Sequence, residues 1–505
     1  MKLFTADKIR ELDQYTIQHE PIASIDLMER AADALFEVIL SMYPVTGTKF
    51  CIFAGPGNNG GDALALARKM QLLPYEVQIH LFGADNFSED CITNKNRLIQ
   101  QYPHLLTEHK YTFAEPEIHE DTIIIDGLFG SGLNRPLTGI YADVIDFINK
   151  TKNTVIAIDI PSGLFAEGCH CGETPVVKAD HTLSFQFPKL AFFFRENESI
   201  VGDWSVLDIG LHPQGIENTD TNYHYLDRSD LISILRKRKK FSHKGTYGHL
   251  ALIAGSEGMA GAAVLAARSA VKSGLGLLTV CSLECNRVIV QTAVPEAIYL
   301  SCHSSGCLAT GFSENRYDAV AIGPGLGTGG LSVQMLTDLL NNFNKPCVFD
   351  ADALNIISEH REMLKHLPQN SILTPHPKEF ERLLGESVQD SFDVVESATE
   401  MACKYHLIIV LKGRYTRIVT PDGNICFNST GNPGMATGGT GDVLTGMIGS
   451  LLAQGYEPEV AAKLGVFLHG MAADIALESE SEESLIASDI INHLGRAFKQ
   501  VSKTE

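Results

Sequence analysis

The chain has 505 residues, 44% of them hydrophobic and 20% charged, which is more than one hydrophobic core usually organises. Two domains are therefore expected. The 61 acidic and 40 basic side chains give a formal net charge of −21, which disfavours nucleic acid and membrane surfaces as partners. This charge favours a protein that acts on small molecules. Its sites must then supply hydrogen-bond donors to an anionic ligand, such as the N–H groups at helix N-termini.

The start of the chain, MKLFTADKIRELDQ, carries charges where a secretory signal would need an apolar run. No uncharged stretch approaches the length of a membrane span. Among the 11 cysteines, Cys169 and Cys171 flank His170 in an apparent loop. Reduced thiols are favoured over a zinc site there, because zinc prefers four ligands and no second cluster is near in sequence. We expect a cytoplasmic protein.

Apolar runs alternate with helical patterns along the first half of the chain. The runs at 49–55, 76–83, 122–130 and 154–163 are short and almost continuously hydrophobic. Parallel strands that are covered by helices on both faces have this character. We therefore predict a Rossmann-like, three-layer α/β/α domain.

The second half repeats this alternation and predicts a second three-layer α/β/α domain. Its predicted strands lie within 249–256, 317–327, 346–352, 371–377 and 407–413. A hairpin with a Pro-Asp-Gly turn is predicted at 417–427. The polar stretch from His212 to Asp230 is the predicted linker between the two domains.

The run GPGNNGGDALALARK, which begins at Gly55, predicts a strand that ends in glycines before a helix. It contains GxGxxG, but we expect Asp62 in the first helical turn, where its carboxylate would occupy the donors that a pyrophosphate needs. Asn58 and Asn59 lie on this turn, and Asp126 and Asp159 end two further buried strands. Each aspartate alone could be a cap or a turn residue, but together they indicate a site.

These motifs resemble a known family. GPGNNGGD, IIDGLFGSGLNRPLTG, AIDIPSGL and the helical LMERAADAL are similar to the NAD(P)H-hydrate epimerase family, also called the YjeF N-terminal family. The resemblance covers residues 1–211. It implies that Asp159 is catalytic and that a potassium ion is bound by Asn59, Asp126 and Ser162. It further implies that the substrate is bound by Asn58, Asn59, Gly60, Gly61, Asp62, Gly130, Ser131, Gly132, Leu133, Asn134, Arg135, Pro136 and Asp159.

In the second half, GGTGD at 438–442 precedes an apolar helix whose first N–H groups could bind an anion. Asp442 is either the N-cap of that helix or a base that accepts a proton as a phosphoryl group arrives, and we favour the base. KGRYT at 412–416 offers a cation and a hydroxyl to nucleotide phosphates, and GPGLG at 323–327 offers a glycine loop.

Together with HKGTYGHLALIAGS, GAAVLAARSAVKSGLG, DADALN and TPHPKEFERL, these motifs resemble the ribokinase-like superfamily and its ADP- or ATP-dependent NAD(P)H-hydrate dehydratase branch. The resemblance covers residues 225–505. It implies that Asp442 is the catalytic base and that Ala262, Gly325, His376 and Asp442 contact the hydrate. It also implies that an adenine nucleotide is bound by Lys412, Gly413, Arg414, Tyr415, Thr416 and Gly441.

The expected protein is thus a homo-oligomeric repair enzyme for hydrated NADH and NADPH. It would epimerise the R and S hydrates and dehydrate the S form at the expense of ADP, with magnesium accompanying the nucleotide. The order of the two halves favours ADP over ATP. Asp350 and Asp352 could position magnesium through water or serve in packing and capping. The alternatives are a small-molecule kinase with a noncatalytic N-terminal binding domain and, less favoured, an oxidoreductase.

Overall fold

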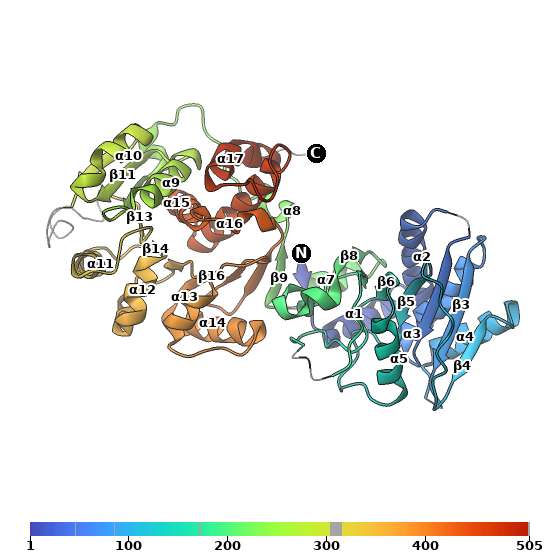
Figure 1. Ribbon diagram of the computed structural model, residues 1–505. Helices are drawn as coiled ribbons and strands as arrows, with labels where there is room; N and C mark the ends of the chain where they lie inside the picture. The colour runs from blue at the N-terminus through green and yellow to red at the C-terminus, as the bar shows by residue number, and fades with distance from the viewer. Residues whose placement is uncertain (46, 85, 171, 173, 303–315, 503–505) are drawn as a thin grey trace. The chain divides into compact units, whose positions relative to one another are not determined.

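The computed structural model describes residues 1–505 except 46, 85, 171, 173, 303–315 and 503–505. The chain divides into two compact units. The N-terminal unit comprises residues 2–221 with 390–392, and the C-terminal unit comprises Met1 with 222–389 and 393–505. Each unit is a largely parallel sheet with helices packed against it, as predicted (Figure 1).

The sheet of the N-terminal unit has the parallel strand order β4-β3-β2-β5-β6-β7-β8. Its strands are β2 (Lys49–Ala54), β3 (Glu76–Phe82), β4 (Leu106–His109), β5 (Ile123–Gly127), β6 (Val155–Ile158), β7 (His181–Phe185) and β8 (Asp203–Leu207), and the short β1 (Lys2–Leu3) precedes them. The helices are α1 (Ala6–His19), α2 (Ser24–Met42), α3 (Asn58–Met70), α4 (Glu89–Gln101), α5 (Ile140–Lys150), α6 (Glu198–Val201) and α7 (Pro213–Asn218).

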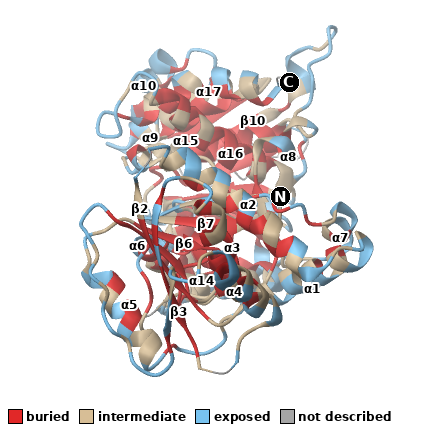
Figure 2. Cartoon of the chain, turned by 90° about the vertical axis from the view of Figure 1, so that its right-hand side faces the viewer, coloured by how far each residue is buried: buried red, intermediate tan, exposed pale blue. Residues whose placement is uncertain are grey.

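Successive residues of β2 face opposite sides of this sheet. Ile52 packs with residues of α2, α3 and α4, whereas its neighbour Phe53 packs with residues of α5. The buried residues therefore follow the strands and the inward faces of the helices (Figure 2). Because both faces are covered, the carboxyl ends of β2, β5 and β6 form the edge at which a ligand can reach the sheet.

The sheet of the C-terminal unit includes the strand order β9-β18-β17-β16-β15-β14-β13-β10-β11-β12. The strands are β9 (Tyr223–Leu226), β10 (His249–Ile253), β11 (Leu277–Ser282), β12 (Ile298–Ser301), β13 (Ala319–Ile322), β14 (Cys347–Phe349), β15 (Ile372–Leu373), β16 (Ile408–Leu411), β17 (Arg417–Val419) and β18 (Ile425–Asn428). The helices are α8 (Arg228–Ile232), α9 (Ala260–Lys272), α10 (Arg287–Ala293), α11 (Gly330–Asn342), α12 (Asp352–Glu359), α13 (Pro377–Leu384), α14 (Ser391–Tyr405), α15 (Thr440–Ala453), α16 (Pro458–Ala476) and α17 (Ala487–Ser502).

Helix α15 lies at the centre of this unit and is buried on all sides from Val443 onward. It packs against α9 so closely that a Cβ at Gly446 would lie 2.0 Å from the carbonyl oxygen of Ala266. Helix α15 also packs against β13 and β14, and Thr445 near its start lies beside Asp350 at the carboxyl end of β14. The predicted hairpin is confirmed, because β17 and β18 are antiparallel with Arg417 opposite Phe427.

The predicted linker, residues 212–230, contains secondary structure, namely α7, β9 and the start of α8. Their polar composition hides these elements in the sequence. His212 caps α7 by accepting a hydrogen bond from the Gln214 N–H, and β9 pairs with β18 along Tyr223–Leu226. Among the helices of the described residues, none is both long and apolar enough to cross a membrane.

Candidate active sites

The N-terminal unit has a cavity of about 680 Å³ where β2, β5 and β6 end. Many of the predicted substrate residues line it, namely Asn58, Asn59, Asp62, Gly130, Ser131, Gly132, Leu133, Asn134, Arg135 and Asp159. Gly60, Gly61 and Pro136 do not belong to the lining. A Cβ at Gly60 would lie 1.8 Å from the Gly55 carbonyl oxygen, and one at Gly61 would lie 2.8 Å from the Met28 sulfur. These two glycines therefore allow α3 to pack closely.

The expected position of Asp62 is wrong. Helix α3 begins at Asn58, so Asp62 is its fifth residue and lies beyond the first turn. Its carboxyl group makes no hydrogen bond with any residue that the structure describes, and hence does not occupy the N-terminal donors of the helix. Burial, together with the nearby Asp159 and Asp13, raises the pKa of Asp62 well above its ordinary value. The surroundings of Asp62 therefore favour its protonated form.

The pKa of Asp159 is shifted in the opposite direction because of Lys189, a residue that the sequence motifs did not include. Burial alone would raise the pKa of Asp159, but the Lys189 ammonium lies 2.7 Å from Oδ1 and the Ser131 N–H donates to Oδ2 at 3.1 Å. These contacts lower the pKa below its ordinary value. Asp159 also has a φ of +66°, a strained conformation for a residue with a Cβ. The loop holds an ionised carboxylate in the cavity.

Asp126, near the end of β5, is completely buried and does not belong to the lining of this cavity. Ser162 donates to it from Oγ at 2.6 Å and from its N–H at 2.8 Å, and the Leu128 N–H donates at 3.2 Å. Burial nevertheless raises the pKa of Asp126 to about 6. No ion pair with another described residue compensates its charge, and Nδ2 of the buried Asn59 has no hydrogen-bond partner in the structure. Buried carboxylates that lack a counter-charge are suited to binding a cation, and potassium accepts oxygen ligands of this kind.

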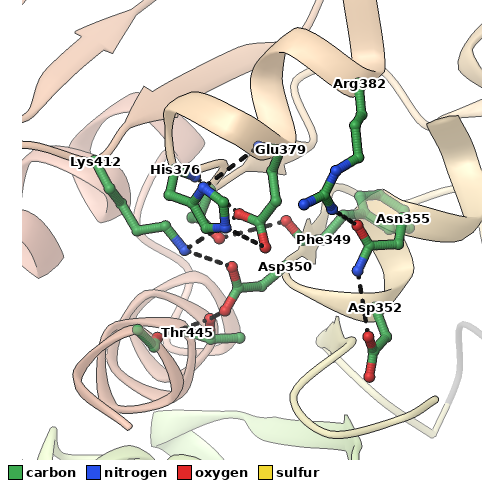
Figure 3. A network of polar contacts seen from close by, with 11 residues as sticks. Phe349, Asp350, Asp352, Asn355, His376, Glu379, Arg382, Lys412 and Thr445 are labelled. Carbon is green, nitrogen blue, oxygen red and sulfur yellow. Dashed lines mark hydrogen bonds and ion pairs between the residues drawn. The ribbon is translucent and has the colours of Figure 1, made fainter. Parts of the chain in front are cut away.

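A network of ion pairs forms the centre of the C-terminal site (Figure 3). Lys412 Nζ lies 2.9 Å from Asp350 Oδ1 and 3.8 Å from Glu379 Oε2, and the Thr445 hydroxyl donates to Asp350 Oδ2 at 2.6 Å. Burial alone would lower the pKa of Lys412, but the two carboxylates raise it. A Cβ at Gly441 would lie 3.4 Å from Lys412 Nζ, so the predicted nucleotide residues Lys412 and Gly441 are brought together.

Asp442 lies in the first turn of α15, since the helix begins within GGTGD at Thr440 rather than after it. The N-cap alternative is excluded, because Gly439 is the N-cap, with a φ of +93° and no side-chain cap. Burial and the neighbouring Asp350 raise the pKa of Asp442 to about 7. Its carboxyl group makes no hydrogen bond with any described residue. Asp442 can therefore exchange a proton near neutral pH.

Two predicted hydrate contacts, Ala262 and Gly325, are also brought together. A Cβ on Gly325 would lie 3.0 Å from the Ala262 Cβ, and the φ of +57° at Gly325 suits glycine. The same loop reaches the DAD segment, where the Gly327 N–H donates to Asp352 Oδ2 at 2.7 Å. Asp350 and Asp352 therefore both have structural contacts, Asp350 with Thr445 and Asp352 with Gly327.

The remaining predicted contacts have local structural roles as well. His376 is the N-cap of α13, where its Nδ1 accepts a hydrogen bond from the Glu379 N–H at 3.3 Å. In the KGRYT segment, the Thr416 hydroxyl donates to the Gly413 carbonyl at 3.1 Å and closes the turn between β16 and β17. Arg414 donates to the Gly431 carbonyl, and its guanidinium lies 5.2 Å from the centre of the Tyr415 ring.

Comparisons with known proteins assign both halves. Residues 24–191 match the family described as YjeF-related protein N-terminus, and residues 250–496 match the family described as NAD(P)H-hydrate dehydratase. Over 520 residues the chain is 34% identical to a bifunctional NAD(P)H-hydrate repair enzyme of Moorella thermoacetica, covering 100% of this chain and 98% of that protein.

The chain belongs to the bifunctional NAD(P)H-hydrate repair enzymes.

A second repair enzyme of this family, from Escherichia coli, is 32% identical over 495 residues. The match covers 97% of this chain and 93% of that protein. Among solved structures, the ADP/ATP-dependent NAD(P)H-hydrate dehydratase of Bacillus subtilis, co-crystallised with ATP and Mg²⁺, is 36% identical with a TM-score of 0.51. It matches 56% of this chain and 100% of its own. A ribokinase-like superfamily protein of Enterococcus faecalis is 27% identical with a TM-score of 0.50, over 57% of this chain and 99% of its own. The resemblance found for each half is thereby confirmed.

Several residues of both sites were missed from the sequence. Lys189, Asp13 and Arg10 lie at the N-terminal cavity, and Glu379 and Thr445 belong to the C-terminal network. Lys189, Asp13, Arg10 and Glu379 lie outside the glycine-rich motifs, and the fold brings them to the sites. Thr445, in contrast, directly precedes Gly446 and lies one helical turn after Gly441. Cys171, one of the two cysteines beside His170, lies outside the described residues.

Proposed function

We propose that this chain interconverts the R and S hydrates of NADH and NADPH in its N-terminal domain, residues 1–211. The C-terminal domain, residues 225–505, then dehydrates the S form with ADP, which yields AMP and phosphate. The observation that carries the proposal is the pair of sites, each with a carboxyl group of perturbed pKa, the buried Asp159 in one and the half-buried Asp442 in the other. Membership of the repair-enzyme family supports both activities.

In the C-terminal site, Asp442 is the proposed base. It accepts the proton of the ring hydroxyl as that oxygen bonds to the terminal phosphorus of ADP, and the phosphorus–oxygen bond to AMP breaks. The phosphorylated carbon then loses phosphate while a proton leaves the adjacent carbon, which restores the dihydropyridine. Lys412 and Gly441 are proposed to bind the nucleotide phosphates, with the turn at 413–416 beside them. Magnesium bound with the nucleotide supplies charge neutralisation of its phosphates; Asp350 and Asp352 are already hydrogen-bonded and would meet it through water.

In the N-terminal site, Asp159 is the proposed catalytic carboxylate, and the cavity residues around it bind the hydrate. Asn59, Asp126 and Ser162 are the proposed potassium ligands, since their buried oxygens and the charge of Asp126 suit a monovalent cation. Bound there, potassium supplies positive charge that steadies the surrounding loops. We further propose a cytoplasmic homo-oligomer with no nucleic-acid or membrane partner.

The direct test is incubation of the purified chain with mixed hydrate epimers and either ADP or ATP. Phosphate release and recovery of the reduced-nicotinamide absorbance are followed together. We expect both signals to rise in equal amounts, with ADP preferred. A small-molecule kinase would instead accumulate a stable phosphorylated product without recovery of the chromophore.

Replacement of Lys412 by alanine is expected to raise the KM for ADP, because a cation on the phosphates contributes mainly to binding. The KM for the S hydrate should change little. Lys412 also neutralises Asp350. If its role were purely structural, the variant would be less stable but its KM for ADP would not change. Initial rates at varied ADP, beside thermal unfolding, separate the two roles. An unchanged KM for ADP would contradict the nucleotide assignment.

Replacement of Asp126 by alanine is expected to weaken potassium binding and to slow epimerisation without affecting dehydration. Potassium should raise the thermal midpoint of the parent's N-terminal unit and leave that of the variant unchanged. The single tryptophan, Trp204 in β8, reports this unit alone. Glu115→Ala, at an exposed loop position, is the matched control. Equal loss of both activities in the Asp126 variant would count against the assignment.

A further inference from the structure

Asp13 lines the N-terminal cavity, and no contact with a described residue gives its carboxyl group a structural role. It lies in α1 and shares the cavity with Asp62 and Asp159. Its carboxyl group forms no hydrogen bond or ion pair with any described residue. A carboxyl group that faces a cavity and lacks such partners is available to a ligand.

The charged and titratable groups around this cavity come from several elements. They are Arg10 and Asp13 of α1, Asp62 of α3, Asp90 of α4, Arg135 of the loop after β5, Asp159 after β6 and Lys189 after β7. Lys189 is already committed to Asp159 at 2.7 Å. Burial and the charge of Asp159 raise the pKa of Asp13 to about 7, whereas Asp159 stays ionised. Two carboxyl groups whose surroundings force different charge states are the pattern of an acid and its anionic partner.

The chemistry of the hydrate needs such a pair. Water adds to the enamine of a dihydropyridine so that the hydroxyl-bearing carbon is bonded to the ring nitrogen. One route to epimerisation at that carbon breaks its carbon–oxygen bond and forms it again on the other face. The departing oxygen needs a proton, and the ring then carries a positive charge.

We propose that Asp13 is a second catalytic carboxyl group of the N-terminal site and donates the proton to the departing hydroxyl, while the ionised Asp159 stabilises the cationic ring. This inference rests on the proposed epimerase function. As the carbon–oxygen bond breaks, its electron pair takes the Asp13 proton and water leaves, and the nitrogen lone pair forms a carbon–nitrogen double bond. Water then adds to the other face, the double-bond pair returns to nitrogen, and the proton of the added water restores Asp13.

The test is the conversion of R hydrate to S hydrate by the full chain without nucleotide, followed by chromatography. Asp13→Asn should lower kcat for epimerisation on the order of 10²-fold with a similar KM, as expected for loss of a general acid. Asp13→Glu should recover part of the rate. Glu11→Gln, an exposed change on the same helix, should behave as the parent. Dehydration of S hydrate with ADP should be unaffected in all three variants.

The parent itself provides a second measurement. Because the acid must be protonated, the epimerisation rate should fall as pH rises through about 7, and Asp13→Asn should lack this decline. Trp204 fluorescence shows whether the N-terminal unit is folded. If the Asp13→Asn variant is unfolded, the pH profile of the parent alone tests the role of Asp13. Parental kcat in Asp13→Asn, a loss confined to KM, or a parent rate independent of pH would overturn the assignment. A parent that does not epimerise at all would instead refute the proposed function and, with it, this role.

Discussion

Replacing Asp442 with asparagine is expected to lower the rate of dehydration by a factor on the order of 10² to 10⁴, the range for loss of a general base. Asparagine keeps the shape of the side chain but cannot accept the hydroxyl proton. Epimerisation should survive, because Asp442 lies in the C-terminal unit and Asp159 in the N-terminal unit. Release of phosphate from S hydrate and ADP measures the first activity, and chromatography of the epimers measures the second.

The pH dependence of the parent gives a further reading of this step. Burial and Asp350 raise the pKa of Asp442 to about 7, so its carboxylate form increases as pH rises through that range. The kcat/KM for dehydration should therefore rise with pH, and the Asn variant should lack this limb. Asp352→Asn, which keeps most of the local packing, is a useful comparison because Asp352 contributes only a smaller part of the shift. If Asp442→Asn dehydrates at the parental rate, Asp442 is not the base.

The strands that carry the sites were predictable because they are buried on both faces. The runs around β2, β5, β6, β13 and β14 are almost continuously hydrophobic. All but β14 end in glycine loops, and β14 is followed directly by Asp350, so polar residues lie at the carboxyl ends of the parallel strands. The elements of 212–230 were not predictable in the same way. Their side chains are mixed in polarity, and the pairing of β9 with β18 depends on residues about 200 positions away.

The candidate sites were predictable only as far as the motifs reach. Asp159 and Asp442 stand beside glycines, and their positions follow from local sequence. Lys189 gives no such signal, since a lysine is usually solvated and here it is 1% exposed. Its role depends on the turn after β7, which brings Nζ to Asp159. Likewise, α3 begins at Asn58, so Asp62 lies beyond the first turn, and the sequence argument that its carboxylate occupies the N-terminal donors does not hold.

Loss of Asp159 is expected to leave a chain that repairs only half of a mixed supply of hydrate. With ADP present, Asp159→Ala should consume the S form at the parental rate, because the C-terminal site is intact. The R form should persist and disappear only as slow uncatalysed epimerisation converts it to the S form. The parent should clear both forms, and the difference appears as a biphasic recovery of the reduced-nicotinamide absorbance.

Because Asp159→Ala leaves the buried Lys189 without a partner, a loss of stability is expected as well. Asp159→Ala combined with Lys189→Met removes both charges and is the matched variant, and Trp204 fluorescence reports whether the N-terminal unit is folded in each. A folded unit that no longer clears the R form places the epimerase chemistry on Asp159 itself. If a folded Asp159 variant still clears the R form as fast as the parent, the N-terminal half is not an epimerase that depends on Asp159, and the binding-module alternative is favoured.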